Sequence, residues 1–220
     1  FLKRGLPIFL CSPVAVTVPE CEKILKLAES TGSAVYSGSF TAGMPENEIR
    51  YATVRRDNIA SFFASTSLGF YTSYANDGLE PLHWLIGSGV RKVALHGWDG
   101  ARGYDPTGIP PSRIHLEYEP RKGNPPIQGT LALGGYKPEM EWYRVYYKNH
   151  SVLEGITTWS NNELTFWNFL TRLQEVFVTN KSLETHKDIL DKLRVVIAAY
   201  KSANEGGRTI DVNEVGTDQF

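Results

Sequence analysis

The stretch from Val90 to Thr158 constrains the fold more than any other part of the sequence, because strand patterns follow one another there without a helix pattern between them. Such a succession is typical of an antiparallel sheet, in which short connections join neighbouring strands. The five predicted strands are Val90–His96, Arg113–Tyr118, Ile127–Leu133, Glu141–Tyr147 and Val152–Thr158. The connection 97–112 is rich in glycine and proline, which predicts a long loop that lines a site.

The first 38 residues predict a different arrangement. Leu6–Cys11 is a continuous apolar run, as in a strand buried on both faces of a parallel sheet. The sequence Thr17-Val18-Pro19-Glu20 then carries the signals of a helix start, and Gly32 is placed to end that helix. Ala34–Ser37 follows as a second strand. This order predicts one βαβ unit of the kind that belongs to a doubly wound sheet.

Three further helices complete the prediction. Asn76–Ile86 has the spacing of a short helix, and Ser160 with Glu163 forms the capping signal of a second one. The third spans Leu183–Ala203, with a predicted buried stripe of Leu190, Leu193, Ile197 and Tyr200, and a short strand 209–212 follows. Residues 38–69 are predicted to be irregular, because 61–67 show no clean period; the alternative is a strand at Tyr51–Arg55. The fold class is therefore α+β, with residues 1–40 as a βαβ remnant and 41–220 as a domain built on an antiparallel sheet.

Charge and cysteine content exclude several classes of function. The chain has 23 Lys and Arg residues against 24 Asp and Glu residues, so no global field would recruit nucleic acid or an anionic membrane. Neither Cys11 nor Cys21 has another ligand residue at metal-binding spacing, and two cysteines are too few for a disulfide framework. No apolar run approaches the roughly 20 residues that cross a bilayer, and 1–11 lack the layout of a secretory signal. We therefore expect a soluble, cytoplasmic protein.

Both ends of the chain resemble one family. Gly5–Ala15 resembles a segment in which a strand leads into a Glu-Lys-Pro turn, and Cys21–Thr31 resembles the helix that follows. Ala198–Val212 closely resembles the closing helix and strand of the same proteins. The sequence is thus similar to the C-terminal, sheet-bearing part of the Gfo/Idh/MocA-type NAD(P)-dependent oxidoreductases. The resemblance implies a nucleotide-binding half that binds NAD or NADP, followed by an open-faced sheet that shapes a pocket for a sugar-like or polyol-like substrate.

The resemblance also implies where the site lies. The lysine position of the Glu-Lys-Pro turn is occupied by Ser12 here, so the usual proton relay cannot pass through it. Cys11, Ser12 and Pro13 form the turn next to which the cofactor would bind. Alignment through Trp84-Leu85-Ile86-Gly87 puts Asp77 and Glu80 on the positions of the histidine and the aspartate of the family. No Gly-x-Gly-x-x-Gly follows a strand anywhere in the 220 residues, so the phosphate-binding turn of the family is missing from this chain.

Glu80 and His83 are three residues apart and would share a helix face as an acid/base pair, although a histidine beside a tryptophan on an apolar helix is more often a packed core residue. His96, Trp98 and Asp99 suit stacking on a sugar and hydrogen bonding to it; the alternative is a polar loop tip. We expect any ligand to lie between the Ser12-Pro13 turn, the helix carrying Asp77, Glu80 and His83, and the loop carrying His96, Trp98 and Asp99.

Two functional hypotheses follow, and a third is remote. The chain is part of an oxidoreductase whose catalytic residues are Asp77, Glu80 and His83, or it is a pseudo-oxidoreductase that binds or scaffolds without hydride transfer. The third is a carbohydrate-binding sheet module. In each case we expect a small sugar-like ligand, no metal, no nucleic acid and no membrane. We also expect a homo-oligomer that forms through the aromatic-rich sheet, where Trp142, Tyr143, Tyr146 and Tyr147 lie.

Overall fold

The computed structural model describes residues 1–11, 13–39, 53–66, 74–97, 112–121, 124–133, 140–158 and 162–216. Its helices are α1 (Val18–Thr31), α3 (Tyr74–Ile86), α4 (Asn162–Thr179) and α5 (His186–Asn204), with short 3-10 turns at Leu2–Arg4, Arg56–Asn58 and Val212–Glu214. Its strands are β1 (Ile8–Cys11), β2 (Val35–Gly38), β3 (Ile59–Thr66), β4 (Val90–His96), β5 (Ser112–Tyr118), β6 (Gln128–Leu133), β7 (Met140–Tyr147), β8 (Val152–Thr158) and β9 (Ile210–Asp211). No helix of this described part has the length and apolar composition needed to cross a bilayer.

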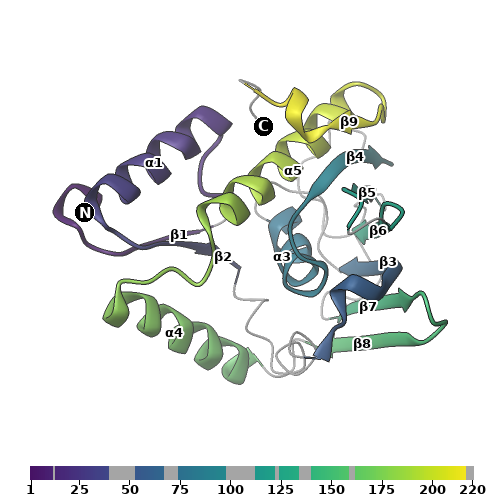
Figure 1. Cartoon of the computed structure of the whole chain (residues 1–220), viewed down its shortest axis with the longest axis horizontal. Coiled ribbons are helices and arrows are strands. Elements are labelled where there is room, and N and C mark those ends of the chain that lie inside the picture. Colours follow the sequence, from purple (N-terminus) through teal and green to yellow (C-terminus); the bar gives the residue numbers. More distant parts are fainter. Residues whose placement is uncertain are drawn as a thin grey trace.

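Seven strands form one large sheet in the order β8-β7-β3-β6-β5-β4-β9. All neighbours in this sheet are antiparallel except β3 and β6, which run parallel. Helices α3 and α5 lie on one face of the sheet, whereas no helix of the described residues lies on the other face (Figure 1). Side chains such as Val93, Ile114 and Leu131 point to the helices and are fully buried. Burial of each such side chain contributes roughly 1.5–3 kcal/mol, so this layer is the main core of the molecule.

The prediction for residues 38–69 was wrong where the structure describes them, because Ile59–Thr66 is a central strand. Its register against β7 shifts between Ile59 and Ser61, which breaks the alternation of apolar and polar residues. Phe62 is buried under the helices, while Phe63 lies on the open face. A strand that is apolar on both faces and bulged at its start has no period of two, and the sequence pattern therefore missed it.

The first two strands form a separate parallel sheet, as the sequence predicted. Ile8 pairs with Val35, and Cys11 pairs with Gly38. Helix α1 begins where it was expected, since the Thr17 hydroxyl accepts a hydrogen bond from the Glu20 N–H at 3.3 Å. The side chains of β1 alternate between two cores: Ile8 and Leu10 pack into the core that includes α1, whereas Phe9 packs against α4. Two helices thus enclose this small sheet, one from each side (Figure 1).

Helix α5 links the large sheet to the βαβ unit, because it packs on β4 and on α1. It begins at a capping box in which Thr185 and Asp188 exchange hydrogen bonds. Leu193 and Ile197 of the predicted stripe are buried in the main core, and Leu190 and Tyr200 pack at its margin. The helix lies against β4, α1 and α3. The capping signal at Ser160 lies outside the described residues, although a helix does begin at Asn162.

Candidate functional site

The carboxyl ends of β1 and β2 lie side by side, because the two strands are parallel and Cys11 pairs with Gly38. Ligands of open α/β sheets bind beyond the carboxyl ends of the strands, so this edge is where a site is expected. Cys11 is exposed there and Pro13 is half-buried, whereas Ser12 lies outside the described residues. Two of the three predicted turn residues are therefore described at the expected edge.

Helix α3 reaches the same edge through Glu80. A Cβ atom on Gly38 would lie 3.1 Å from the Glu80 Oε1 atom and 3.0 Å from the hydroxyl oxygen of Tyr36. A side chain at this position would therefore be in tight contact with both Tyr36 and Glu80. The structure therefore brings Cys11, Gly38 and Glu80 together, although they come from distant parts of the sequence.

Glu80 is one of three buried titratable side chains that meet at this place. The Lys192 ammonium donates hydrogen bonds to Glu80 Oε2 at 2.7 Å, to Glu184 Oε1 at 2.6 Å and to the Ser37 carbonyl at 2.9 Å. The second Glu80 oxygen, Oε1, accepts a hydrogen bond from the Trp84 indole at 3.1 Å. We call Glu80, Glu184 and Lys192 the Lys192 cluster. Their side chains are 1%, 2% and 9% exposed, so one ammonium and two carboxyl groups are removed from water together.

His83 lies on the same helix but has a different partner. Its Nε2 atom is 3.7 Å from Asp188 Oδ1, and its side chain is 15% exposed. Burial is the main cause that lowers the pKa of His83, and the nearby Lys192 ammonium acts in the same direction. The imidazole is therefore neutral at pH 7. Glu80 is hydrogen-bonded to Lys192 and Trp84, whereas His83 faces Asp188. The described contacts therefore do not join Glu80 and His83 as the predicted acid/base pair.

The remaining predicted residues either lie away from this edge or are outside the described part of the chain. Asp77 belongs to α3, but its side chain lies outside the described residues, as do Trp98 and Asp99. His96 ends β4 and is exposed; its ring centroid is 5.5 Å from that of His115 on the open face of the sheet. Because Val93 and Leu95 of the same strand face the helices, the sheet separates His96 from Glu80 and His83.

Sequence analysis missed Lys192, Glu184 and Tyr36. A signal for Lys192 does exist, because it lies within the buried face of α5, between Ile189 and Val196. A lysine in an apolar stripe is rarely buried unless it is paired, which could have marked it as a partner for a distant carboxylate. Glu184 and Tyr36 carry no comparable mark.

Two hollows of the surface are lined by described residues, and neither touches this edge. One of about 420 Å³ lies at Val54–Asn58. The other, of about 350 Å³, lies on the open face of the large sheet around His115, Thr130 and Gln128.

Comparison with known proteins establishes the fold. No family model matches the sequence, and no curated protein matches it either. Among solved structures, a probable dehydrogenase from Thermotoga maritima has a TM-score of 0.75 at 13% identity, covering 97% of this chain and 76% of that one. Scyllo-inositol dehydrogenase from Lactobacillus casei, with bound NAD(H) and scyllo-inositol, has a TM-score of 0.68 at 12% identity, covering 93% and 73%. The WlbA dehydrogenase from Bordetella pertussis, in complex with NADH and UDP-GlcNAcA, has a TM-score of 0.65 at 11% identity, covering 94% and 72%.

The chain thus has the fold of Gfo/Idh/MocA-type dehydrogenases over nearly its whole length, as the sequence resemblance implied. The likeness covers 93–97% of this chain and about three quarters of each of those chains. At 11–13% identity the likeness concerns the fold, and the chemistry has to be argued from the residues themselves.

Proposed function

We propose that this chain forms the substrate-binding part of an NAD(P)-dependent oxidoreductase that acts on a sugar or polyol. The fold carries this proposal, since the solved structures that share it include dehydrogenases with NAD(H) or NADH and a sugar-like ligand bound. A second support is local. Cys11 is exposed at the carboxyl edge of the parallel sheet, Glu80 lies next to Gly38 at the same edge, and a carboxylate is a kind of group that orients hydroxyls.

The residues described here do not fit the diphosphate of a dinucleotide. The helix after β1 begins with the Thr17 side chain bonded to the Glu20 N–H, and the Glu20 carboxylate lies in its first turn. A carboxylate there opposes a phosphate, which helix N-termini otherwise attract. Binding of NAD or NADP to this fold therefore requires a phosphate cradle from residues other than these, and Cys11 and Pro13 would lie beside the cofactor.

The edges of the small sheet suggest where such residues would attach. The outward carbonyls of β2 are occupied, because Ser182 donates to the Val35 carbonyl and Lys192 donates to the Ser37 carbonyl. Ile8 donates to Ala34, so Phe9 and Cys11 direct their backbone groups to the other side of β1. No described residue pairs with that side. A two-stranded parallel sheet is marginal by itself, so a nucleotide-binding unit would add its strands to β1.

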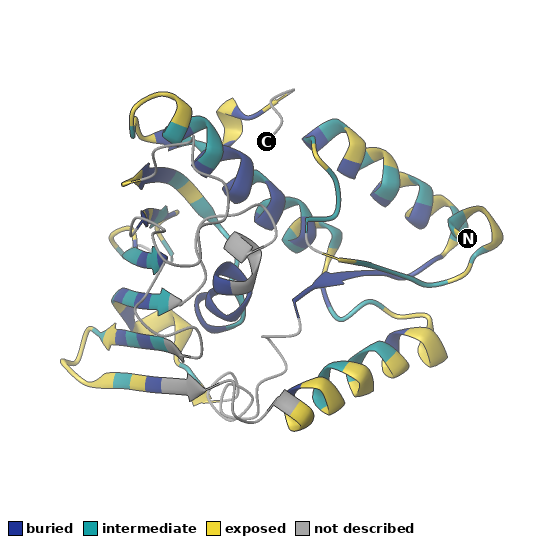
Figure 2. Ribbon diagram, turned by 180° about the vertical axis from the view of Figure 1, so that it is seen from behind, coloured by how far each residue is buried: buried dark blue, intermediate teal, exposed yellow. Residues whose placement is uncertain are grey.

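Exposed apolar side chains on α4 support the same arrangement. Phe166, Leu170 and Phe177 are about half exposed and share one stripe of the helix, next to the face that packs on Phe9 and Tyr36. Figure 2 shows that most of α4 faces solvent. A helix that is apolar around most of its circumference is normally covered, which fits an added unit beside β1.

Binding of NADH to the complete gene product tests this proposal. We expect a saturable change in NADH fluorescence and oxidation of inositols, polyols or sugars with NAD or NADP. The Glu80→Gln variant should lose turnover, whereas Glu175→Gln, which alters an exposed carboxylate on α4, should keep it. Absence of detectable NADH binding under these conditions counts against the oxidoreductase proposal.

One observation favours the alternative of a non-catalytic relative. Both Glu80 oxygens are engaged, Oε1 by Trp84 and Oε2 by Lys192, and Ser12 stands where the family has its lysine. A general base needs an acceptor free to take the proton of the substrate, which Glu80 in this state does not offer. NADH binding without turnover on any of these substrates would favour this alternative, and robust turnover that disappears in Asp77→Asn or Glu80→Gln would exclude it.

A further inference from the structure

Three segments that are far apart in the sequence meet at the Lys192 ammonium. Ser37 is the penultimate residue of β2, Glu80 belongs to α3, and Glu184 precedes α5. Lys192 and Glu80 are 112 residues apart in the chain, and Lys192 and Ser37 are 155 apart. The three hydrogen bonds of Lys192 therefore fasten the end of the parallel sheet to the helices that cover the large sheet.

The charges in this cluster do not balance. One ammonium faces two carboxylates, and all three side chains are almost fully buried. The other titratable or charged groups around the cluster are Tyr36 from β2, His83 from α3, Arg172 from α4 and Asp188 from α5. Arg172 lies over the Trp84 ring with its guanidinium carbon 5.0 Å from the ring centroid, and Asp188 adds a further negative charge near Glu184. A second buried carboxylate without its own cation is costly in its ionised form.

Two buried polar atoms in this region have no hydrogen-bond partner among the described residues. They are the Glu184 Oε2 atom and the Tyr36 hydroxyl. A buried ionised carboxylate oxygen without a donor has lost its hydrogen bonds to water and has no protein hydrogen bond to replace them. A protonated oxygen avoids most of this cost, because the neutral carboxyl is much less strongly hydrated.

We propose that the Lys192 cluster is a proton-binding junction, in which Glu184 holds a proton at neutral pH and its release at alkaline pH weakens the attachment of β2 to α3 and α5. Burial is the main cause that raises the pKa of Glu184 to about 8, and the Glu80 carboxylate adds to this effect against the opposing Lys192 ammonium. The group is thus protonated in the folded state at a pH at which an exposed glutamate is ionised.

The direction of the pH dependence follows from this difference. The pKa of Glu184 is about 8 in the folded protein and lies near the ordinary 4.5 in the unfolded chain. Its contribution to stability is complete below the unfolded value and is lost as the pH rises through the folded value. The protein should therefore lose stability as the pH rises from about 4.5 to about 8, so it should be less stable at pH 9 than at pH 6.

The test compares the melting temperature of the wild-type chain and of Glu184→Gln between pH 6 and pH 9. We expect the Tm of the wild type to fall by several degrees over this range and that of Glu184→Gln, whose amide resembles the neutral carboxyl in shape, to stay level. Glu175→Gln on the exposed side of α4 is the matched control and should follow the wild type. A wild-type Tm that is level over the range, or a Glu184→Gln variant that loses stability as steeply as the wild type, overturns the proposal.

A second measurement needs no variant, in case Glu184→Gln does not fold. The infrared spectrum of the wild-type chain should show the C=O stretch of a protonated buried carboxyl at pH 6 and lose it by pH 9. Amide hydrogen exchange in β2 and α3, corrected for the intrinsic pH effect, should become faster at pH 9 while exchange in β5 and β6 changes less. A spectrum without that band at pH 6 contradicts the proposal. None of these readouts uses cofactor or substrate, so the outcome does not depend on the oxidoreductase proposal.

Discussion

At the scale of single residues, Gly38 shows how little room there is at the carboxyl edge. A methyl group at this position would lie 3.0 Å from the Tyr36 hydroxyl and 3.1 Å from Glu80 Oε1. Both neighbours are buried, so neither can move away without disturbing the Lys192 cluster. We expect Gly38→Ala to destabilise the protein by about 1–3 kcal/mol in urea unfolding. Gly216→Ala, where no atom lies within 4 Å of the new Cβ, should change stability little, and equal effects of the two variants would contradict this account.

The two cysteines differ in their environment and should differ in reactivity. Cys21 is fully buried, and burial is the main cause that raises its pKa to about 11. Cys11 is exposed at the carboxyl edge. Because the thiolate is the reactive form, a maleimide or Ellman reagent at pH 8 should modify Cys11 and leave Cys21 unmodified in the folded protein. Mass spectrometry locates the label, and Cys11→Ser should remove it; rapid labelling of Cys21 would show that the core around α1 opens.

At the scale of elements, the centre of the large sheet depends on one pair across β3 and β6. Phe62 lies opposite Gly129, and a Cβ on Gly129 would fall 2.3 Å from the Phe62 ring. The ring occupies the space that the glycine leaves and meets Tyr118 edge-on, with ring centroids 6.0 Å apart. This close approach explains why a glycine, normally unfavourable in a strand, stands at a central position of β6.

We therefore expect Gly129→Ala to cost about 2–3 kcal/mol in chemical unfolding, as overpacking of a core does. The double variant Phe62→Leu with Gly129→Ala should recover part of this loss, because the smaller side chain makes room for the methyl group. Phe62→Leu alone supplies the reference. Strict additivity of the two single effects would mean that the ring and the glycine do not interact.

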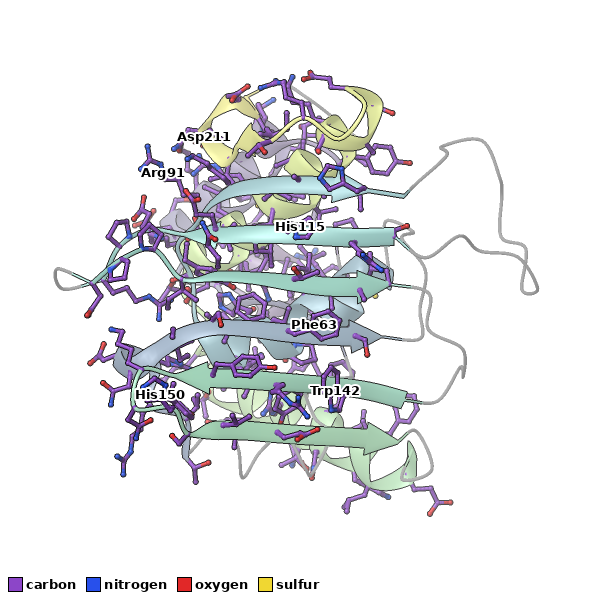
Figure 3. The ribbon with its side chains drawn as sticks, turned by 90° about the vertical axis from the view of Figure 1, so that its right-hand side faces the viewer. Phe63, Arg91, His115, Trp142, His150 and Asp211 are labelled. Carbon is purple, nitrogen blue, oxygen red and sulfur yellow. The ribbon has the colours of Figure 1, made fainter. Side chains whose placement is uncertain are left out.

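At the scale of the whole molecule, the face of the large sheet opposite α3 and α5 carries exposed aromatic side chains. Phe63 and Trp142 pack together there with ring centroids 5.4 Å apart, and the Arg144 guanidinium lies 5.1 Å from the Trp142 ring centroid. Figure 3 shows this face with Phe63 and Trp142 on its β3-β7-β8 half and His115 on the other half. Tyr146 and Val152, which pair across β7 and β8, are 37% and 49% exposed. An aromatic sheet face of this kind is a candidate for self-association.

We expect the chain to form an oligomer through this face in sedimentation velocity at micromolar concentrations. Tyr146→Glu should shift the distribution towards the monomer, because it places a charge in the apolar contact. Val178→Glu, at a more exposed apolar position on α4, serves as the control and should leave the distribution unchanged. A wild-type chain that sediments as a monomer, or a larger effect of Val178→Glu, would locate any contact elsewhere.

The sequence by itself determined the local elements. The apolar run before Ser12, the capping threonine at Thr17 and the alternation in 90–96, 112–118 and 152–158 depend on neighbouring residues, so their strands and helices could be predicted with ends correct to within a few residues. The resemblance of both chain ends to one family added the fold as a whole. The tertiary structure decided which elements meet, including the parallel pairing of β3 with β6 and the insertion of β3 between strands that are consecutive in the chain.

For the candidate site too, some residues could be predicted from the sequence, whereas their partners depend on the tertiary structure. Glu80 and His83 could be named from spacing on one helix, because residues three apart share a face. Their partners could not be named, since Lys192 lies 112 residues from Glu80 and is brought to it only when α5 packs between the two sheets. Local patterns record which side of an element is apolar, whereas the pairing of buried charges depends on long-range packing, and that packing alone decided that Glu80 is an ion-paired junction residue at the end of β2.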